Sequence, residues 1–100
     1  MSVFSMVSAR IPPERTPELI ARFGAAVRAG MPERRQTTLL RGDGERWSII
    51  TFWRSRQDFD NYLASVDEPF ATRLFHDAGG GTPEVNVFEV VLDSNAKFWP

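Results

Sequence analysis

The sequence predicts an α+β fold of the ferredoxin-like, split βαβ kind, with a four-stranded antiparallel sheet and helices on one face. Two observations predict it. Strand-like and helix-like segments follow one another in the order β-α-β-β-α-(α)-β, which is the order of that fold. A length of 100 residues suits one hydrophobic core. We therefore expect a single domain over residues 1–100, with a core over 3–92 and a C-terminal tail over 93–100.

The composition is that of a packed domain with aromatic groups to spare for a pocket or an interface. Apolar residues make up 42% and aromatic residues 12%. The formal net charge is -1 and the arginines form no stripe, so we expect no nucleic-acid partner. The lack of cysteine excludes disulfides and thiolate sites and fits a reducing compartment. Without a signal sequence or an apolar run of about 20 residues, we expect a cytoplasmic protein with no membrane partner.

Four segments are typical of strands. They are residues 3–11, 35–41, 45–53 and 85–92. The first is rich in β-branched and aromatic residues and stops at Pro12-Pro13, where neither a ladder nor a helix interior can continue. Gly42-Asp43-Gly44 separates the second from the third and predicts a hairpin. Because the run 45–53 is apolar on both faces, we expect it in the centre of the sheet.

Three stretches are predicted to be helical. The first begins at Thr16, whose hydroxyl is expected to cap it, and ends at Gly30. The second follows Ser55 in a capping-box pattern. The third begins near Pro69 and ends at Gly79-Gly80-Gly81, which we expect to be a mobile connection and a candidate lid. The apolar stripe of the first helix is Leu19, Phe23, Val27 and Gly30.

Several strands look apolar on both faces, although the helices of this fold cover only one. The other face must pack against something else, and a second copy of the chain is the simplest partner. We therefore expect a homodimer. The aromatic end of the tail, Phe98-Trp99-Pro100, is predicted to dock on the partner subunit or on the sheet.

Residues 38–65, TLLRGDGERWSIITFWRSRQDFDNYLAS, resemble the hairpin, tryptophan-ended strand and following helix of antibiotic biosynthesis monooxygenases. The resemblance implies the dimeric α/β-barrel superfamily: a ferredoxin-like homodimer with a pocket between sheet and helices. Some members oxidise polycyclic aromatic polyketides with O2 and without bound metal or flavin, while others resemble heme-degrading oxygenases. It thus implies an oxidoreductase of antibiotic biosynthesis that acts on a small aromatic molecule with O2 and no cofactor.

The resemblance also names positions in the pocket. The cofactor-independent members carry a Trp at the end of the hairpin's second strand, an Asn four residues before it, and an Asn just before an Arg in the first strand. Trp53 matches the Trp, whereas Ile49 and Ala9 stand at the two amide positions and cannot orient an enol or stabilise an oxyanion. Heme-degrading relatives carry an Asn, a Trp and a His where we align Ala9, Tyr62 and Leu74. We therefore expect no heme degradation of that kind.

Three residues are candidates for the site: Trp53, Tyr62 and His76. Trp53 would pack against a ligand's ring system, or would simply close the end of the core. The Tyr62 hydroxyl could serve as a donor or acid, or be a core hydroxyl with a partner. His76 can exchange a proton near neutral pH, or be a cation that stabilises the end of a helix. No spacing of His and carboxylates matches a metal site, so we predict no metal.

Three hypotheses for the function remain open. The leading one is a cofactor-independent monooxygenase of an aromatic, quinone-type or polyketide metabolite, in which Tyr62 or His76 moves the proton. The second is a non-catalytic ligand-binding or assembly module, which the two missing amides favour. The third is a cofactor-free isomerase or cyclase, which needs acid and base groups but no oxygen. If Ile49, Phe59 and Leu74 fill the space behind Trp53, the enzymatic hypothesis fails.

Overall fold

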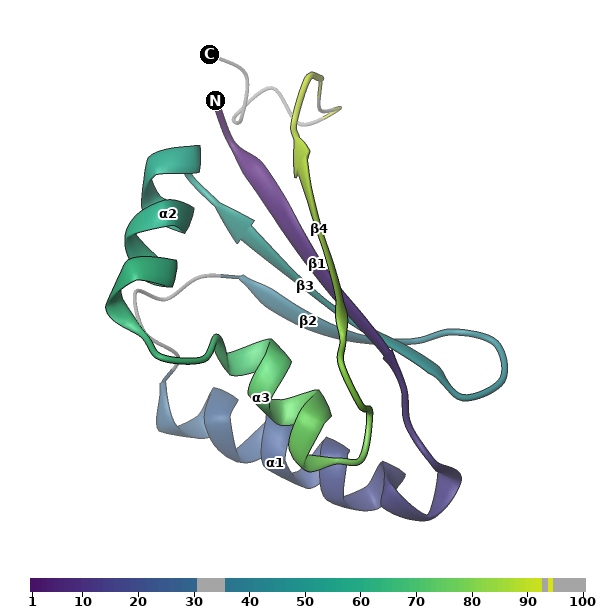
Figure 1. Ribbon diagram of the computed structural model, residues 1–100. Coiled ribbons are helices and arrows are strands. Elements are labelled where there is room, and N and C mark those ends of the chain that lie inside the picture. The colour runs from purple at the N-terminus through teal and green to yellow at the C-terminus, as the bar shows by residue number, and fades with distance from the viewer. Residues whose placement is uncertain (31–35, 93, 95–100) are drawn as a thin grey trace.

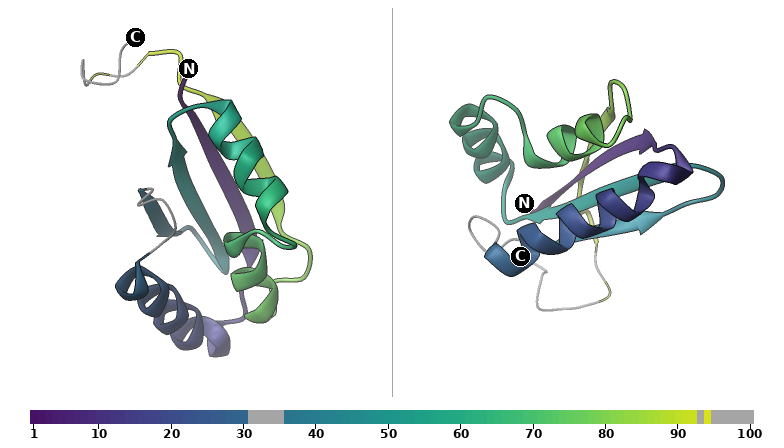
Figure 2. Two further views of the ribbon diagram at one scale, coloured as in Figure 1. Left: turned by 90° about the vertical axis from the view of Figure 1, so that its left-hand side faces the viewer. Right: turned by 90° about the horizontal axis from the view of Figure 1, so that it is seen from below.

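The computed structural model describes residues 1–30, 36–92 and 94 and shows one sheet with three helices on one side (Figures 1 and 2). The strands are β1 (Val3–Arg10), β2 (Thr37–Arg41), β3 (Arg46–Trp53) and β4 (Glu84–Glu89), all antiparallel in the order β2-β3-β1-β4. The helices are α1 (Thr16–Ala29), α2 (Arg56–Ser65) and α3 (Phe70–Asp77). This confirms the predicted α+β, ferredoxin-like fold and the central place of β3.

The core lies between the sheet and the helices, in two clusters. The larger one is built around Leu19 of α1 and Phe75 of α3, both fully buried, with Ile11 and Ile49. The smaller one consists of Val3, Trp53 and Phe59. Alternation along β1 and β3 turns the helix-facing side chains into this core, so the position of Trp53 follows from the strand pattern.

Several predicted boundaries differ from the structure. The last strand ends at Glu89 and not at residue 92, because Glu89 pairs with Val3 at the very start of β1. Among the described residues, only one further backbone bond follows, from Val90 N to Ser2 O. A short 3-10 helix, Pro13–Arg15, leads into α1, so Arg15 occupies the cap position and makes no side-chain cap bond. The predicted Thr16 cap is therefore wrong.

Other predictions on the helices gave mixed outcomes. Ser55 caps α2, since its Oγ accepts a hydrogen bond from the Asp58 N–H at 3.1 Å. Phe23 of α1 packs on Phe70 of α3, with ring centroids 6.4 Å apart. Val27, one turn beyond Phe23, is 50% exposed, so the apolar stripe is buried only along the part of α1 that meets α3. The predicted strand start at residue 35 and the aromatic tail 98–100 lie outside the described residues.

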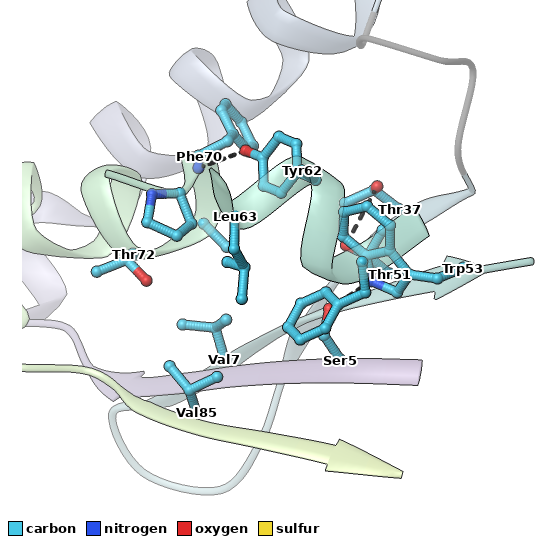
Figure 3. Close-up of a pocket in the computed structure, with 13 residues that line it drawn as sticks. Ser5, Val7, Thr37, Thr51, Trp53, Tyr62, Leu63, Phe70, Thr72 and Val85 are labelled. Carbon is cyan, nitrogen blue, oxygen red and sulfur yellow. Dashed lines mark hydrogen bonds between the residues drawn. The ribbon is translucent and has the colours of Figure 1, made fainter. Parts of the chain in front are cut away.

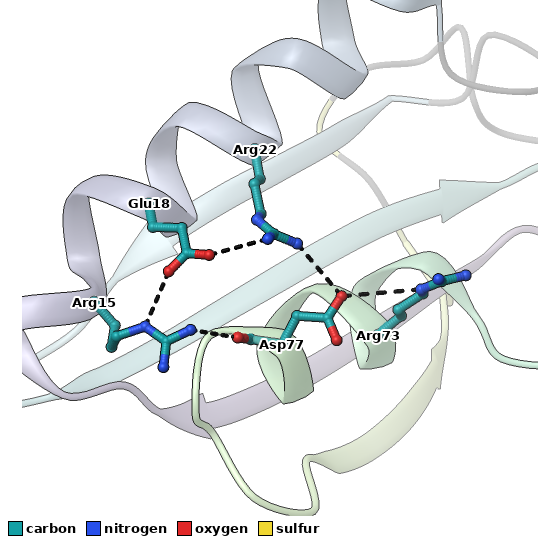
Figure 4. A network of polar contacts seen from close by, with 5 residues as sticks. All are labelled: Arg15, Glu18, Arg22, Arg73 and Asp77. Atoms are coloured by element: carbon teal, nitrogen blue, oxygen red, sulfur yellow. Dashed lines mark hydrogen bonds and ion pairs between the residues drawn. The ribbon is translucent and has the colours of Figure 1, made fainter.

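A network of exposed charges joins α1 to α3 (Figure 4). Arg15 donates to Glu18 at 2.9 Å and to the Asp77 backbone oxygen at 2.7 Å. Arg22 pairs with Glu18 at 3.0 Å and with Asp77 at 3.5 Å, and Arg73 adds a contact of 3.9 Å to Asp77. The hydrogen bond from Arg15, with the charges of Arg15 and Arg22, lowers the pKa of Glu18 below 4.5. The ionised Glu18 carboxylate stabilises the folded state only slightly, because its ion pairs are exposed. This contribution is present above the usual carboxyl pKa and is lost as the pH falls through the lowered pKa.

Gly80, in the glycine run after α3, packs against the core, whereas Gly79 and Gly81 are exposed. The Gly80 N–H donates to the Phe75 carbonyl at 2.8 Å, and Gly79 and Gly81 adopt φ angles of 86° and 64°, which favour glycine. A Cβ on Gly80 would lie 2.9 Å from the Phe75 oxygen and 3.0 Å from Ile11 Cδ1. The connection is thus anchored at Gly80, and its role as a lid stays a prediction.

The sheet face that points away from the helices is also apolar. Phe4 and Phe52 pair across β1 and β3 with ring centroids 5.4 Å apart. Phe88, opposite Phe4 on β4, is 51% exposed, and Met6 and Ile50 continue the surface along the same two strands. The expected apolar character of both faces is thus observed. Within the described residues, no helix has the length and apolarity needed to cross a bilayer.

Candidate functional site

A cavity of about 270 Å³ lies behind Trp53, between the sheet and the pair α2 and α3 (Figure 3). All four strands contribute to its floor, while α2, α3 and the connection between them form its roof. Phe59 forms part of the wall, but Ile49 and Leu74 are core residues outside the lining. The space behind Trp53 is therefore open. Ile49, Phe59 and Leu74 do not fill it, so the enzymatic hypothesis does not fail on this ground.

Trp53 is held in one orientation at the end of β3. Its side chain is 4% exposed, and its Nε1–H donates to Ser5 Oγ at 2.9 Å. The indole ring lies 5.1 Å from the Phe59 ring and 5.1 Å from the Tyr62 ring, measured between centroids. Packing and a hydrogen bond together fix this wall of the cavity, which suits a group that must position a flat ligand.

Tyr62 of α2 also lines the cavity. Its hydroxyl oxygen accepts a hydrogen bond from the Phe70 N–H at 2.9 Å, and Phe70 is the first residue of α3. The bond ties the two helices of the roof together. The hydroxyl thus has a partner, as one of the two alternatives for Tyr62 expects, and the residue also lines the cavity; its role as a donor or acid stays a prediction.

His76 lies elsewhere. Its side chain is exposed in the last turn of α3 and it is not among the residues that line the cavity. The neighbours Leu74 and Phe75 point into the core, which turns His76 outward on a short helix. The structure therefore brings Trp53 and Tyr62 together but not His76, whose place matches the alternative of a cation at a helix end.

Four hydroxyl-bearing residues of the lining were not predicted: Ser5, Thr37, Thr51 and Thr72. Strand alternation already places Ser5 and Thr51 on the helix-facing side of their strands. Their assembly around one space depends on the pairing of β1, β2 and β3, which no local signal in the sequence gives. None of the described residues that line the cavity is charged.

The two positions where the resemblance expects amides do not reach the cavity. Ile49 is buried in the larger core cluster, and Ala9 lies where a Cβ on Gly80 would touch it at 3.1 Å. Over the described part of the chain, no three His, Asp or Glu side chains gather as a group that could hold a metal ion. The described residues of the site offer the chemistry of hydroxyls and aromatic rings.

Comparisons with known proteins agree with the fold. The chain is similar to a heme-degrading protein from Mycobacterium tuberculosis in its heme-free form, with 25% identity over 95% of this chain and 100% of that one and a TM-score of 0.65. It is similar to a variant of SnoaB, a cofactor-independent oxygenase from Streptomyces nogalater, with 21% identity over 93% and 96% of the two chains and a TM-score of 0.62. A conserved protein from Methanosarcina mazei Go1 gives 12% identity, coverage of 89% and 92%, and a TM-score of 0.69.

A search of the curated proteins gives no match. The family model described as antibiotic biosynthesis monooxygenase matches residues 2–71. The match runs from the start of the sheet through Trp53 and α2 to the first residues of α3, so it includes most of the cavity wall. By sequence and by fold, the chain belongs to the antibiotic biosynthesis monooxygenase family.

Proposed function

We propose that the chain is a cofactor-independent monooxygenase whose cavity binds a small aromatic, quinone-type or polyketide metabolite. The supporting observation is the cavity itself, walled by the rings of Trp53, Phe59 and Tyr62. Such rings favour offset or edge contacts with a flat aromatic ligand. At about 270 Å³ the space is near the lower end of ligand pockets, which start at roughly 300 Å³, so we expect a ligand of a few fused rings.

In this proposal Trp53 packs against the ring system and Tyr62 exchanges a proton with the ligand's hydroxyl. An electron-rich phenolate can itself reduce O2: the ring carbon that is a CH2 group in the keto tautomer becomes C=O, the second oxygen atom leaves as water, and every electron comes from the substrate. No outside reductant is then required. The protein's part is to hold the ligand and exclude water, which is the kind of positioning that lowers reaction barriers.

Oxygen consumption tests the proposal. With dihydroxynaphthalenes and hydroxyanthrones as substrates, we expect Trp53→Phe to lower kcat/KM by about ten-fold or more, because the smaller ring no longer fills the wall and cannot bond to Ser5. Trp47→Phe is the matched control, since Trp47 lies on the same face of β3 in the larger core cluster, outside the lining. Equal rates for wild type and Trp53→Phe would remove Trp53 from the mechanism.

Two more variants identify the residue that exchanges the proton with the ligand. Tyr62→Phe is expected to lower kcat with little change in KM, because it keeps the ring and removes the hydroxyl. His76→Ala tests the third predicted residue, whose exposed position gives no support for contact with the ligand. A loss of rate in His76→Ala and none in Tyr62→Phe would reverse the assignment.

The same assays separate the other hypotheses. Tight binding with neither oxygen consumption nor product would indicate the non-catalytic binding module. Product formed without oxygen would indicate the isomerase or cyclase. Oxygen consumption that requires the substrate, with water as the second product, is expected if the chain is a monooxygenase.

We also propose that the outer face of the sheet packs against a second copy of the chain. Phe88 on that face is 51% exposed, and Ile20 on α1 is 48% exposed, so they form a matched pair. Phe88→Asp is expected to convert a dimer to monomers in light scattering after gel filtration, whereas Ile20→Asp leaves the mass unchanged. A monomeric wild type, or a dimer that survives Phe88→Asp, would contradict this arrangement.

A further inference from the structure

Three hydroxyl groups form a row across the floor of the cavity. Ser5 of β1 pairs with Thr51 of β3, and Thr51 pairs with Thr37 of β2. All three residues line the cavity, and Figure 3 shows them on its sheet side, next to Trp53. The row runs at right angles to the strands, since it follows the pairing from one strand to the next.

The hydrogen bonds of the row do not use the hydroxyl hydrogens of Ser5 and Thr51. Each hydroxyl has one hydrogen and two lone pairs. Ser5 Oγ accepts from Trp53 Nε1 at 2.9 Å, and Thr37 Oγ1 donates to Thr51 Oγ1 at 3.3 Å. In the described part of the structure, no hydrogen bond uses the hydroxyl hydrogens of Ser5 and Thr51. Ser5 is only 5% exposed, so a bound acceptor would satisfy a buried donor that otherwise costs free energy.

The surroundings of the row restrict what can accept these hydrogens. Across the cavity, the roof presents mainly apolar groups, among them Leu63, Pro69 and Ala71. No described lining residue is charged, so none of these groups would offset the cost of burying a carboxylate. Neutral carbonyl or hydroxyl oxygens meet no such penalty.

The spacing of the two donors sets the pattern of the acceptors. Opposed Cβ atoms in an antiparallel pair lie about 4.5–5.5 Å apart, which is close to the separation of two oxygens in a 1,3 relation on a ring. Two oxygens on opposite edges of a fused ring system cannot both reach the same row. The donors therefore favour oxygens on one edge.

We propose that Ser5, Thr51 and Thr37 are the specificity-determining row of this cavity, and that they select a neutral, planar ligand with two oxygen acceptors on one edge. Ser5 and Thr51 donate to the two oxygens, and Thr37 orients Thr51 by donating to it. This inference rests on the proposed function, because it takes the cavity to be a binding site for aromatic molecules.

Binding of two isomers to the full chain, measured by calorimetry without oxygen, tests the row. 1,3-Dihydroxynaphthalene carries its oxygens on one ring, and 1,5-dihydroxynaphthalene carries the same groups on opposite edges. We expect the wild type to bind the 1,3 isomer about ten-fold more tightly, the value of one to two hydrogen bonds. Thr51→Val, which keeps the β-branched shape, is expected to remove most of the preference, and Thr51→Ser to retain it.

Thr38→Val is the matched control. Thr38 lies next to Thr37 on β2 and pairs with Ile50, so it occupies the outer face of the sheet, and the preference is expected to persist in this variant. Circular dichroism verifies that each variant is folded. Ser5→Ala does not isolate the row, because it also removes the partner of Trp53.

Failure of the hydroxyl row and failure of the monooxygenase proposal give different results. Binding of neither isomer, equal binding of both, or a preference that survives Thr51→Val overturns the row. Oxygen consumption that accompanies equal binding leaves the monooxygenase proposal standing without the row. A preference lost in Thr51→Val but without oxygen consumption supports the row and overturns the monooxygenase.

Discussion

Replacing Trp53 with alanine is expected to lower the free energy of unfolding by about 3–5 kcal/mol, the usual cost of removing a buried aromatic ring. The side chain is 4% exposed and packs on both Phe59 and Tyr62. Its loss would merge the space of the indole with the existing cavity, which lies directly beside it. Ser5 would lose the donor that now satisfies its oxygen.

Urea denaturation followed by circular dichroism measures this change. Val27→Ala is a suitable control, because Val27 is 50% exposed on α1 and exposed substitutions usually change stability by about 0.5 kcal/mol or less. A loss below about 1 kcal/mol for Trp53→Ala would mean that the indole is not packed as the structure shows. Trp53 would then be a mobile surface group and no wall of a binding site.

Replacing Gly80 with alanine is expected to lower the free energy of unfolding by about 1–3 kcal/mol, the typical cost of overpacking a core. The new Cβ would lie 2.9 Å from the Phe75 carbonyl oxygen and 3.1 Å from Ala9 Cβ. Neither neighbour can rotate away: the carbonyl accepts the Gly80 N–H, and a β-carbon moves only with its backbone.

Gly24→Ala provides the contrast. Gly24 lies inside α1, and a Cβ there would meet only the Arg28 guanidinium, at 3.2 Å from Nη1, a flexible end that can move. Alanine in a helix interior is favoured over glycine by roughly 0.5–1 kcal/mol, so this variant is expected to be more stable than wild type. If both variants shift the urea midpoint in the same direction, the packing assigned to Gly80 is wrong.

Local sequence patterns predict most of the fold, because they show which faces of a strand or helix are buried and where the chain turns back. The apolar character of both faces of residues 45–53 predicts a central strand, and Gly42-Asp43-Gly44 predicts the hairpin; β3 lies between β2 and β1 as expected. The end of β4 could not be predicted, since it depends on where β1 begins. The cap of α1 was misplaced because the Pro13–Arg15 turn had not been foreseen.

The candidate site was only partly predictable. The resemblance indicates Trp53, and helix periodicity places Tyr62 on the apolar side of its helix; both line the cavity. The hydroxyl row joins residues from three strands, with Ser5 and its partner Trp53 separated by 48 positions, and such neighbours emerge only with the strand pairing. The imidazole of His76 and its place beside the glycines predict a role at the site, but the burial of Leu74 and Phe75 orients His76 away from the cavity.

The floor and the roof of the cavity come from different parts of the chain, and they therefore differ in how many substitutions they can tolerate. The floor belongs to strands whose opposite side forms the apolar outer face, so a backbone shift there would disturb two surfaces at once. The roof consists of two short helices linked by the bond between Tyr62 and Phe70. Substitutions in the roof can reshape the space while leaving the sheet intact. A protein built in this way can accept a ligand of a new size through changes in its helices, while the proposed hydroxyl row of the sheet stays in place.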